Sequence, residues 1–163
     1  MKGIFFGSLT GNTESVAREI AARLGIADEH IHNVADASAD DAERYDLLLL
    51  GSPTWGSGEL QDDWYGFLEL LKARNLAGRR VALFGCGDSG SFPDTFCDAI
   101  GIIHEALQPT GCTFVASLDA GGYASLGSRA CSDGRLLGLV VDDSDPESNA
   151  DRMESWCRLV EAL

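Results

Sequence analysis

Short apolar runs alternate along the chain with stretches in which apolar residues recur every three or four positions. The run from Leu47 to Leu50 consists of four consecutive leucines and is followed by Gly51. A run that is apolar on both faces is what a buried parallel strand requires. Similar runs predict the other strands, at residues 3–6, 81–84, 114–117 and 136–141, with a weaker one at 31–34.

The stretches between these runs predict amphipathic helices, because their apolar residues fall on one helical face. The residues on these faces are Val16, Ile20 and Leu24; then Trp64, Phe67, Leu68 and Leu71; then Phe96, Ile100, Ile103 and Leu107; and finally Met153, Trp156, Val160 and Leu163. We expect Ser148 to cap the last helix. A βα unit repeated five times predicts an α/β fold, a three-layer α/β/α sandwich around a parallel sheet.

One stretch departs from this alternation. From Leu118 to about Arg135 the chain is rich in glycine and serine, and it interrupts the fifth strand, which resumes at Leu136. A length of 163 residues fits one domain, and no linker or repeat divides the chain. We therefore expect a single domain over residues 1–163, with an insertion at about 118–135.

The chain is strongly acidic, with 12 Lys and Arg against 26 Asp and Glu and a net charge of −14. This balance argues against binding to nucleic acid or to an anionic membrane, since both need a basic surface. No apolar run approaches the roughly 18 residues of a membrane span. The acidic run Asp142, Asp143, Asp145 and Glu147 and the pair Asp62 and Asp63 predict a negative face that attracts basic protein partners.

The cysteines indicate a reduced protein without a structural metal. Their number, five, is odd, and they form neither a CxxC pair nor a metal-ligand spacing. We therefore expect no disulfide framework, no metal and a cytoplasmic location. The first residues lead directly into a strand pattern, so no signal peptide is expected.

The loop after the first strand suits a phosphate group. It contains three hydroxyls, an amide and a glycine but no charge, and it leads directly into a helix, whose N-terminus favours anions. No GKS or GKT follows, so the loop is not a P-loop. A single phosphate monoester fits such a neutral cradle. The alternative is a polar turn that only caps the helix.

Two further loops offer aromatic side chains. After the third strand, Trp55 lies close to Gly56 and Gly58, where it is expected at the rim of a cleft rather than folded back on the core. After the fourth strand, a glycine-rich loop ends in Phe92, whereas Phe96 is expected in the core. Ligands of such sheets bind beyond the carboxyl ends of the strands. The three loops together predict a site for a planar ring that carries a phosphate.

With these loops the sequence resembles the flavodoxin family, in its long-chain class. The matching segments follow one another along nearly the whole chain, at 8–14, 51–56, 59–64, 83–88, 96–101 and 138–142. Flavodoxins have a five-stranded sheet of order 2-1-3-4-5 and bind FMN at the switch point in that order. The resemblance therefore implies this strand order, an insertion that splits strand 5, and FMN bound without a covalent bond.

The resemblance also implies which residues bind the cofactor. The phosphate would lie on residues 8–13, and the ring between Trp55 and Phe92, which stands where the family usually has tyrosine. Thr95 and Cys97 fall where the family has polar contacts to the flavin edge. The expected cofactor-binding residues are Ser8, Leu9, Thr10, Gly11, Asn12, Thr13, Pro53, Thr54, Trp55, Gly56, Ser57, Gly58, Cys86, Gly87, Asp88, Phe92, Thr95 and Cys97.

The implied function is a low-potential one-electron carrier that shuttles electrons between redox proteins and is not a turnover enzyme. We expect carboxylates near the flavin, those of Glu59, Asp62, Asp63 and Asp88, to lower its potential. A monomer is expected, with partners such as a flavodoxin/ferredoxin-NADP reductase or low-potential oxidoreductases that present basic surfaces. The alternative is an FMN-dependent NAD(P)H:quinone reductase of the same fold. A phospho-receiver domain is excluded because strand 3 ends in Leu50-Gly51-Ser52, without the required aspartate.

Overall fold

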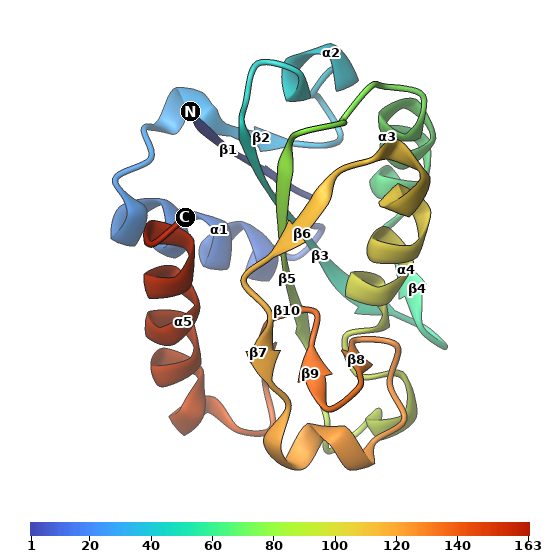
Figure 1. The fold of residues 1–163 in the computed structure, drawn as a ribbon. Helices are drawn as coiled ribbons and strands as arrows, with labels where there is room; N and C mark the ends of the chain where they lie inside the picture. The colour runs from blue at the N-terminus through green and yellow to red at the C-terminus, as the bar shows by residue number, and fades with distance from the viewer.

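The apolar runs form a central parallel sheet in the computed structural model, which describes residues 1–163 (Figure 1). Five of its seven strands form one continuous path, namely β1 (Lys2–Phe6), β2 (Ile31–Asn33), β3 (Leu47–Trp55), β5 (Arg80–Gly87) and β10 (Gly138–Asp142). They lie in the order β10-β5-β3-β1-β2, all parallel. Counted along the chain, this is the predicted order 2-1-3-4-5, so the fold prediction is confirmed.

Helices cover both faces of the sheet (Figure 1). The helices α1 (Asn12–Leu24) and α5 (Pro146–Glu161) lie on one face, and α3 (Asp62–Lys72) and α4 (Asp98–Leu107) on the other. The leucine run of β3 shows why both faces are apolar. Leu47 and Leu49 pack in the core under α1 and α5, whereas Leu48 and Leu50 pack in the core under α3 and α4. Successive side chains of a strand point to opposite faces, so each layer receives alternate leucines.

Three of the helix predictions need correction. Leu163, expected on the apolar face of the last helix, lies beyond Glu161, where that helix ends, and is 47% exposed. The last helix begins at Pro146 with Asp145 at its N-cap, not at Ser148. Proline suits the first turn of a helix, where its missing N–H is not needed. The helix α3, which follows β3 and β4 (Glu59–Leu60), forms as predicted. Phe96 was expected on the next helix, α4, but it is buried just before that helix begins at Asp98. The connection between β2 and β3 contains only one short helix, the four-residue α2 (Ala39–Ala42). Short 3₁₀ turns occur elsewhere in the chain, at Asp28–His30, Pro93–Thr95 and Gln108–Thr110.

The predicted split of the fifth strand is visible along the edge of β5. Before the insertion, β6 (Thr113–Val115) pairs with residues 80–82 of β5, and after it β10 pairs with residues 83–87. The insertion itself contains β7 (Leu118–Asp119), a 3₁₀ turn (Gly121–Ser125), β8 (Cys131–Ser132) and β9 (Arg135–Leu136). These strands form a separate antiparallel sheet, β7-β9-β8, at the lower end of the molecule in Figure 1.

None of the helices is both long enough and apolar enough to cross a lipid bilayer.

Candidate functional site

Three loops converge at the edge where the parallel strands end. The chain leaves β1 beside β3, because the Gly7 N–H donates to the Gly51 carbonyl at 3.0 Å. Pro53 of β3 is in register with Cys86 of β5. The hydroxyl of Thr13, at the start of α1, lies 3.8 Å from the Cys86 sulfur. The ends of β1, β3 and β5 thus bring the three predicted loops together.

The first loop leaves a group of backbone donors unpaired. Gly11 adopts a left-handed conformation with φ of 88°, which turns the chain into α1. Its N–H donates to the Ser8 hydroxyl at 3.1 Å. The N–H groups of the other residues from 8 to 14 donate no hydrogen bond within the protein. Unpaired N–H groups at a helix N-terminus attract an anion. This loop therefore fits a phosphate, as the sequence predicts.

The hairpin after β3 places Trp55 outside the hydrophobic core. Its turn is closed by the Gly58 N–H, which donates to the Trp55 carbonyl at 3.1 Å. Gly56 and Gly58 have φ values of 52° and 94°, a region that favours glycine. Trp55 is half-buried, unlike Trp64 and Trp156, which are fully buried. Its indole therefore belongs to the edge of the site rather than to the core.

A small cavity lies between this hairpin and the loop after β5. Its volume is about 90 Å³, and it is lined by Thr54, Gly56, Gly87, Asp88, Phe92, Thr95, Phe96 and Cys97. Seven of these eight were predicted from the sequence. The eighth, Phe96, was expected only in the core, because its apolar spacing does not reveal that it also lines a cavity. The remaining predicted residues do not line this cavity, and Leu9 is 75% exposed on its loop.

The Asp88 loop is held by its own hydrogen bonds. The Asp88 carboxylate accepts from the Ser144 hydroxyl, from the Ser91 N–H at 3.0 Å and from the Gly90 N–H at 3.1 Å. These donors, of which the Ser144 hydroxyl has the largest effect, hold the pKa of Asp88 below its usual range. Burial, followed by the charges of Asp88 and Asp142, raises the pKa of nearby Asp143. The site therefore carries at least one carboxylate, that of Asp88, which is held in its charged form.

The two cysteines at the site are thiols without nucleophilic activation. Burial raises the pKa of Cys86 to about 12, and it also raises the pKa of Cys97. Since the thiolate is the reactive form, neither residue is a nucleophile at neutral pH. Cys97 instead packs closely against Gly87, where an added Cβ would lie 3.1 Å from the Cys97 sulfur.

Asp142 was expected on the acidic surface, and the structure corrects this prediction. It is fully buried at the end of β10. Its carboxylate accepts from the Ser89 N–H at 3.0 Å, the Ser144 N–H at 2.9 Å and the Tyr123 hydroxyl at 2.9 Å. The only sequence signal was its position directly after the apolar run Leu139–Val141. Asp143 and Glu147 of the same acidic run are exposed as expected.

This buried carboxylate predicts a loss of stability in acid. Burial alone raises the pKa of Asp142, but the donors from Ser89, Ser144 and Tyr123 outweigh it, so the pKa is below its ordinary value of 3.8. The unfolded chain therefore binds the proton first, and the contribution of Asp142 is present above pH 3.8 and lost as the pH falls through its folded-state pKa. We expect Asp142→Asn to cost about 2 kcal/mol at neutral pH.

Urea unfolding of the cofactor-free protein at several pH values measures this effect. The difference in unfolding free energy between the wild type and Asp142→Asn should shrink as the pH falls below 3.8. A constant difference down to the most acid pH would contradict the role of the Asp142 charge.

The comparisons with known proteins agree in one family. The family model described as flavodoxin matches residues 4–156. Flavodoxin 1 of Salmonella typhimurium is 44% identical over 162 residues, which cover 98% of this chain and 92% of that protein. The flavodoxin of Haemophilus influenzae is 41% identical, covering 97% and 92%. A solved structure of Fusobacterium nucleatum flavodoxin bound to flavin mononucleotide has a TM-score of 0.90 at 26% identity, covering 99% of this chain and 96% of that one.

Proposed function

This chain belongs to the flavodoxin family, and we propose that it is an electron carrier whose redox group is non-covalently bound FMN. The observation that carries the proposal is the run of unpaired N–H groups at residues 8–14, at the same sheet edge as a cavity for a ring. Such a set of neutral donors fits the phosphate of FMN. When bound, FMN accepts and releases electrons singly, so the chain acts as a carrier and not as a turnover enzyme.

We assign the phosphate to residues 8–13 and one edge of the flavin ring to the cavity between Thr54 and Cys97. A volume of about 90 Å³ is much smaller than the sites of whole drug-sized ligands, so this cavity encloses an edge of the ring. Trp55 and the 59%-exposed Phe92 offer aromatic faces beside it. The assignment also includes Pro53, Ser57, Gly58 and Cys86, which adjoin the cavity along β3, its hairpin and β5.

The charges at the site support a low potential. Asp88 lines the cavity, Glu59 lies beside Trp55 on the hairpin, and no lysine or arginine lines the cavity. Negative charge accumulating on a reduced flavin would be repelled by these carboxylates. The protein therefore disfavours full reduction, which is the property of a low-potential carrier.

Reconstitution tests this function directly. We expect the purified cofactor-free protein to bind FMN in a 1:1 complex, to acquire the visible absorption of a flavin, and to release unmodified FMN on denaturation. A protein that takes up no FMN would overturn the proposal. Rapid reduction of the complex by NADPH alone, without a reductase, would instead favour the quinone reductase of the same fold.

Exposed carboxylates support docking to basic redox partners, and a flavodoxin/ferredoxin-NADP reductase is the partner type we propose. Asp62, Asp63, Asp143 and Glu147 are exposed, in keeping with the net charge of −14. We further propose a monomer that functions in the cytoplasm, where the five cysteines would remain the free thiols found here. The described chain would act as one domain.

The docking proposal predicts a strong dependence of the association rate on salt. Raising the ionic strength from about 10 mM to about 150 mM shortens the Debye length from about 30 Å to about 8 Å. We expect the rate constant for electron transfer from a reductase, measured by stopped flow, to fall about tenfold over this range. A rate that does not change with salt would exclude electrostatic steering.

A further inference from the structure

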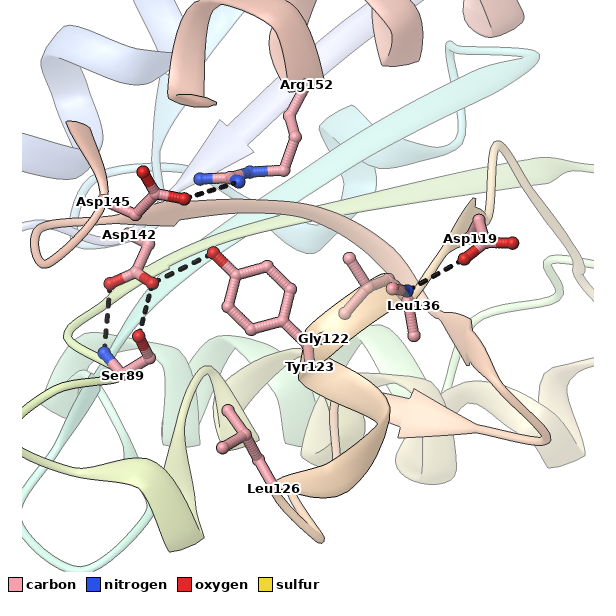
Figure 2. Close-up of a pocket in the computed structure, with 11 residues that line it drawn as sticks. Ser89, Asp119, Gly122, Tyr123, Leu126, Leu136, Asp142, Asp145 and Arg152 are labelled. Atoms are coloured by element: carbon pink, nitrogen blue, oxygen red, sulfur yellow. Dashed lines mark hydrogen bonds and ion pairs between the residues drawn. The ribbon is translucent and has the colours of Figure 1, made fainter. Parts of the chain in front are cut away.

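One stacked pair of aromatic side chains links two cavities of this protein. Phe96 lines the small cavity of the proposed flavin site. The ring of Tyr123, from the insertion, stacks on Phe96 with centroids 5.0 Å apart and an interplanar angle of 17°. Tyr123 in turn lines a second cavity of about 490 Å³, which Figure 2 shows between the insertion and the start of α5. The insertion thus reaches the wall of the flavin site through one stacked pair.

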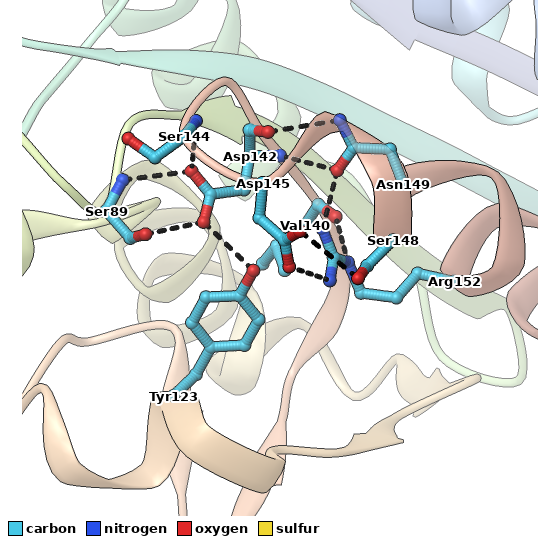
Figure 3. A network of polar contacts seen from close by, with 9 residues as sticks. All are labelled: Ser89, Tyr123, Val140, Asp142, Ser144, Asp145, Ser148, Asn149 and Arg152. Carbon is cyan, nitrogen blue, oxygen red and sulfur yellow. Dashed lines mark hydrogen bonds and ion pairs between the residues drawn. The ribbon is translucent and has the colours of Figure 1, made fainter.

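The hydroxyl of Tyr123 connects the insertion to the loop that follows β5. It donates to Asp142 Oδ2 at 2.9 Å, and the Ser89 hydroxyl donates to the same oxygen at 2.5 Å (Figure 3). The Ser89 N–H donates to the other carboxylate oxygen at 3.0 Å. Ser89 follows Asp88, which lines the flavin cavity. One carboxylate therefore fixes both Tyr123 and the Asp88 loop.

Asp142 is itself held rigidly by α5. Its N–H donates to the Asn149 side chain at 2.9 Å, and the Asn149 amide donates back to the Asp142 carbonyl at 3.1 Å. Arg152 also donates to Asn149 and places its guanidinium 5.4 Å from the centre of the Tyr123 ring. The hydrogen bonds to Asn149, drawn in Figure 3, fix the main chain of Asp142, which makes its buried carboxylate an anchor.

We propose that Tyr123 is a positioning residue, by which the insertion holds Phe96 and the Asp88 loop in the arrangement that binds FMN. This inference rests on the proposed function. The half-buried ring of Tyr123 packs against the core on the side of Phe96 and borders the large cavity on another side, so packing holds it only in part. Its hydroxyl is the tether that completes this hold, and loss of the bond to Asp142 lets the ring shift toward the cavity and loosens its stack on Phe96.

Two substitutions separate the tether from the stack. Tyr123→Phe removes only the hydroxyl, and Tyr123→Leu also removes the aromatic ring. The matched control is Tyr45→Phe, because the Tyr45 hydroxyl also makes hydrogen bonds, at 3.0 Å to His30 and 2.7 Å to His32. Tyr45 is fully buried against Gly3 at the opposite end of β1, away from the flavin site.

The readouts are the FMN dissociation constant, the midpoint potentials of the flavin, and the hydrogen exchange of the Ser89 amide in the cofactor-free protein. We expect Tyr123→Phe to raise the dissociation constant about fivefold, because the lost bond is not made to FMN and only part of its energy affects FMN binding. Tyr123→Leu should raise it further, and both should shift the potentials and speed the exchange of Ser89. Tyr45→Phe should lower stability but leave the dissociation constant, the potentials and the Ser89 exchange unchanged.

A purely structural role would give a different pattern. If Tyr123→Phe and Tyr123→Leu lose stability but keep the wild-type dissociation constant and potentials, the positioning role is overturned. If the wild type itself binds no FMN, the proposed function fails, but the hydrogen exchange of the Ser89 amide still tests whether Tyr123 anchors the Asp88 loop. Faster exchange of Ser89 in Tyr123→Phe then supports the anchoring, and unchanged exchange overturns it.

Discussion

Replacing Asn12 by aspartate is expected to weaken FMN binding about 30-fold while leaving riboflavin binding unchanged. Asn12 is exposed at the first position of α1, beside the unpaired N–H groups assigned to the phosphate. The substitution changes almost no volume but adds one negative charge. Repulsion of a partly exposed phosphate by this charge costs about 2 kcal/mol, which corresponds to about 30-fold in the dissociation constant. Riboflavin has no phosphate and does not experience this repulsion.

The same substitution should stabilise the cofactor-free protein. A negative charge at a helix N-terminus contributes about 0.3–1 kcal/mol through the helix dipole. Weaker FMN binding and higher stability therefore occur in one variant, so a folding defect cannot explain the lost affinity. Titration of the apoprotein with each flavin and urea unfolding provide the two measurements.

Asn75→Asp is the matched control for this experiment. It makes the same change of charge on the exposed segment between α3 and β5, where the Asn75 side chain accepts from the Ala77 N–H. It should leave both flavin affinities unaltered. Equal losses of FMN and riboflavin affinity in Asn12→Asp would contradict the assignment of the phosphate to residues 8–13.

Local patterns predict the sheet and the three loops because the information lies in contiguous residues. The run Leu47–Leu50 defines a buried strand by itself, and a parallel sheet places the ends of β1, β3 and β5 at one edge. The polar loop before α1 likewise indicates an anion site without knowledge of any other segment. Most of the candidate site could therefore be located from the sequence.

The missing parts depend on contacts between segments distant in the chain. Asp142 occurs in an acidic run, and only its burial against Ser89 and Tyr123 makes it an anchor. The pairing of Phe96 with Tyr123 joins residues on either side of α4, and no periodicity reports it. The start of α5 was placed late because Ser148 is a good cap in isolation, whereas Pro146 already fits the first turn.

The second large effect is expected where the chain returns from the insertion into the sheet. Gly138 is the first residue of β10 and is in register with Leu83 of β5. A Cβ on Gly138 would overlap the carbonyl oxygen of Leu83. This oxygen belongs to the backbone of a central strand and cannot rotate away as a side chain can. Gly138→Ala must therefore push β10 away from β5 and weaken their hydrogen bonds.

We expect Gly138→Ala to lower the unfolding free energy by about 3 kcal/mol or more, a large part of the roughly 5–15 kcal/mol of a typical domain. Gly66→Ala is the opposite control, because Gly66 lies within α3 with nothing near its Cβ position. Alanine should stabilise that helix by about 0.5–1 kcal/mol. Urea unfolding of both variants measures the two changes in unfolding free energy, which should have opposite signs. If Gly138→Ala lowers the unfolding free energy by less than about 1 kcal/mol, β10 is not held tightly against β5. Asp142, four residues further along the same strand, would then not be a rigid anchor.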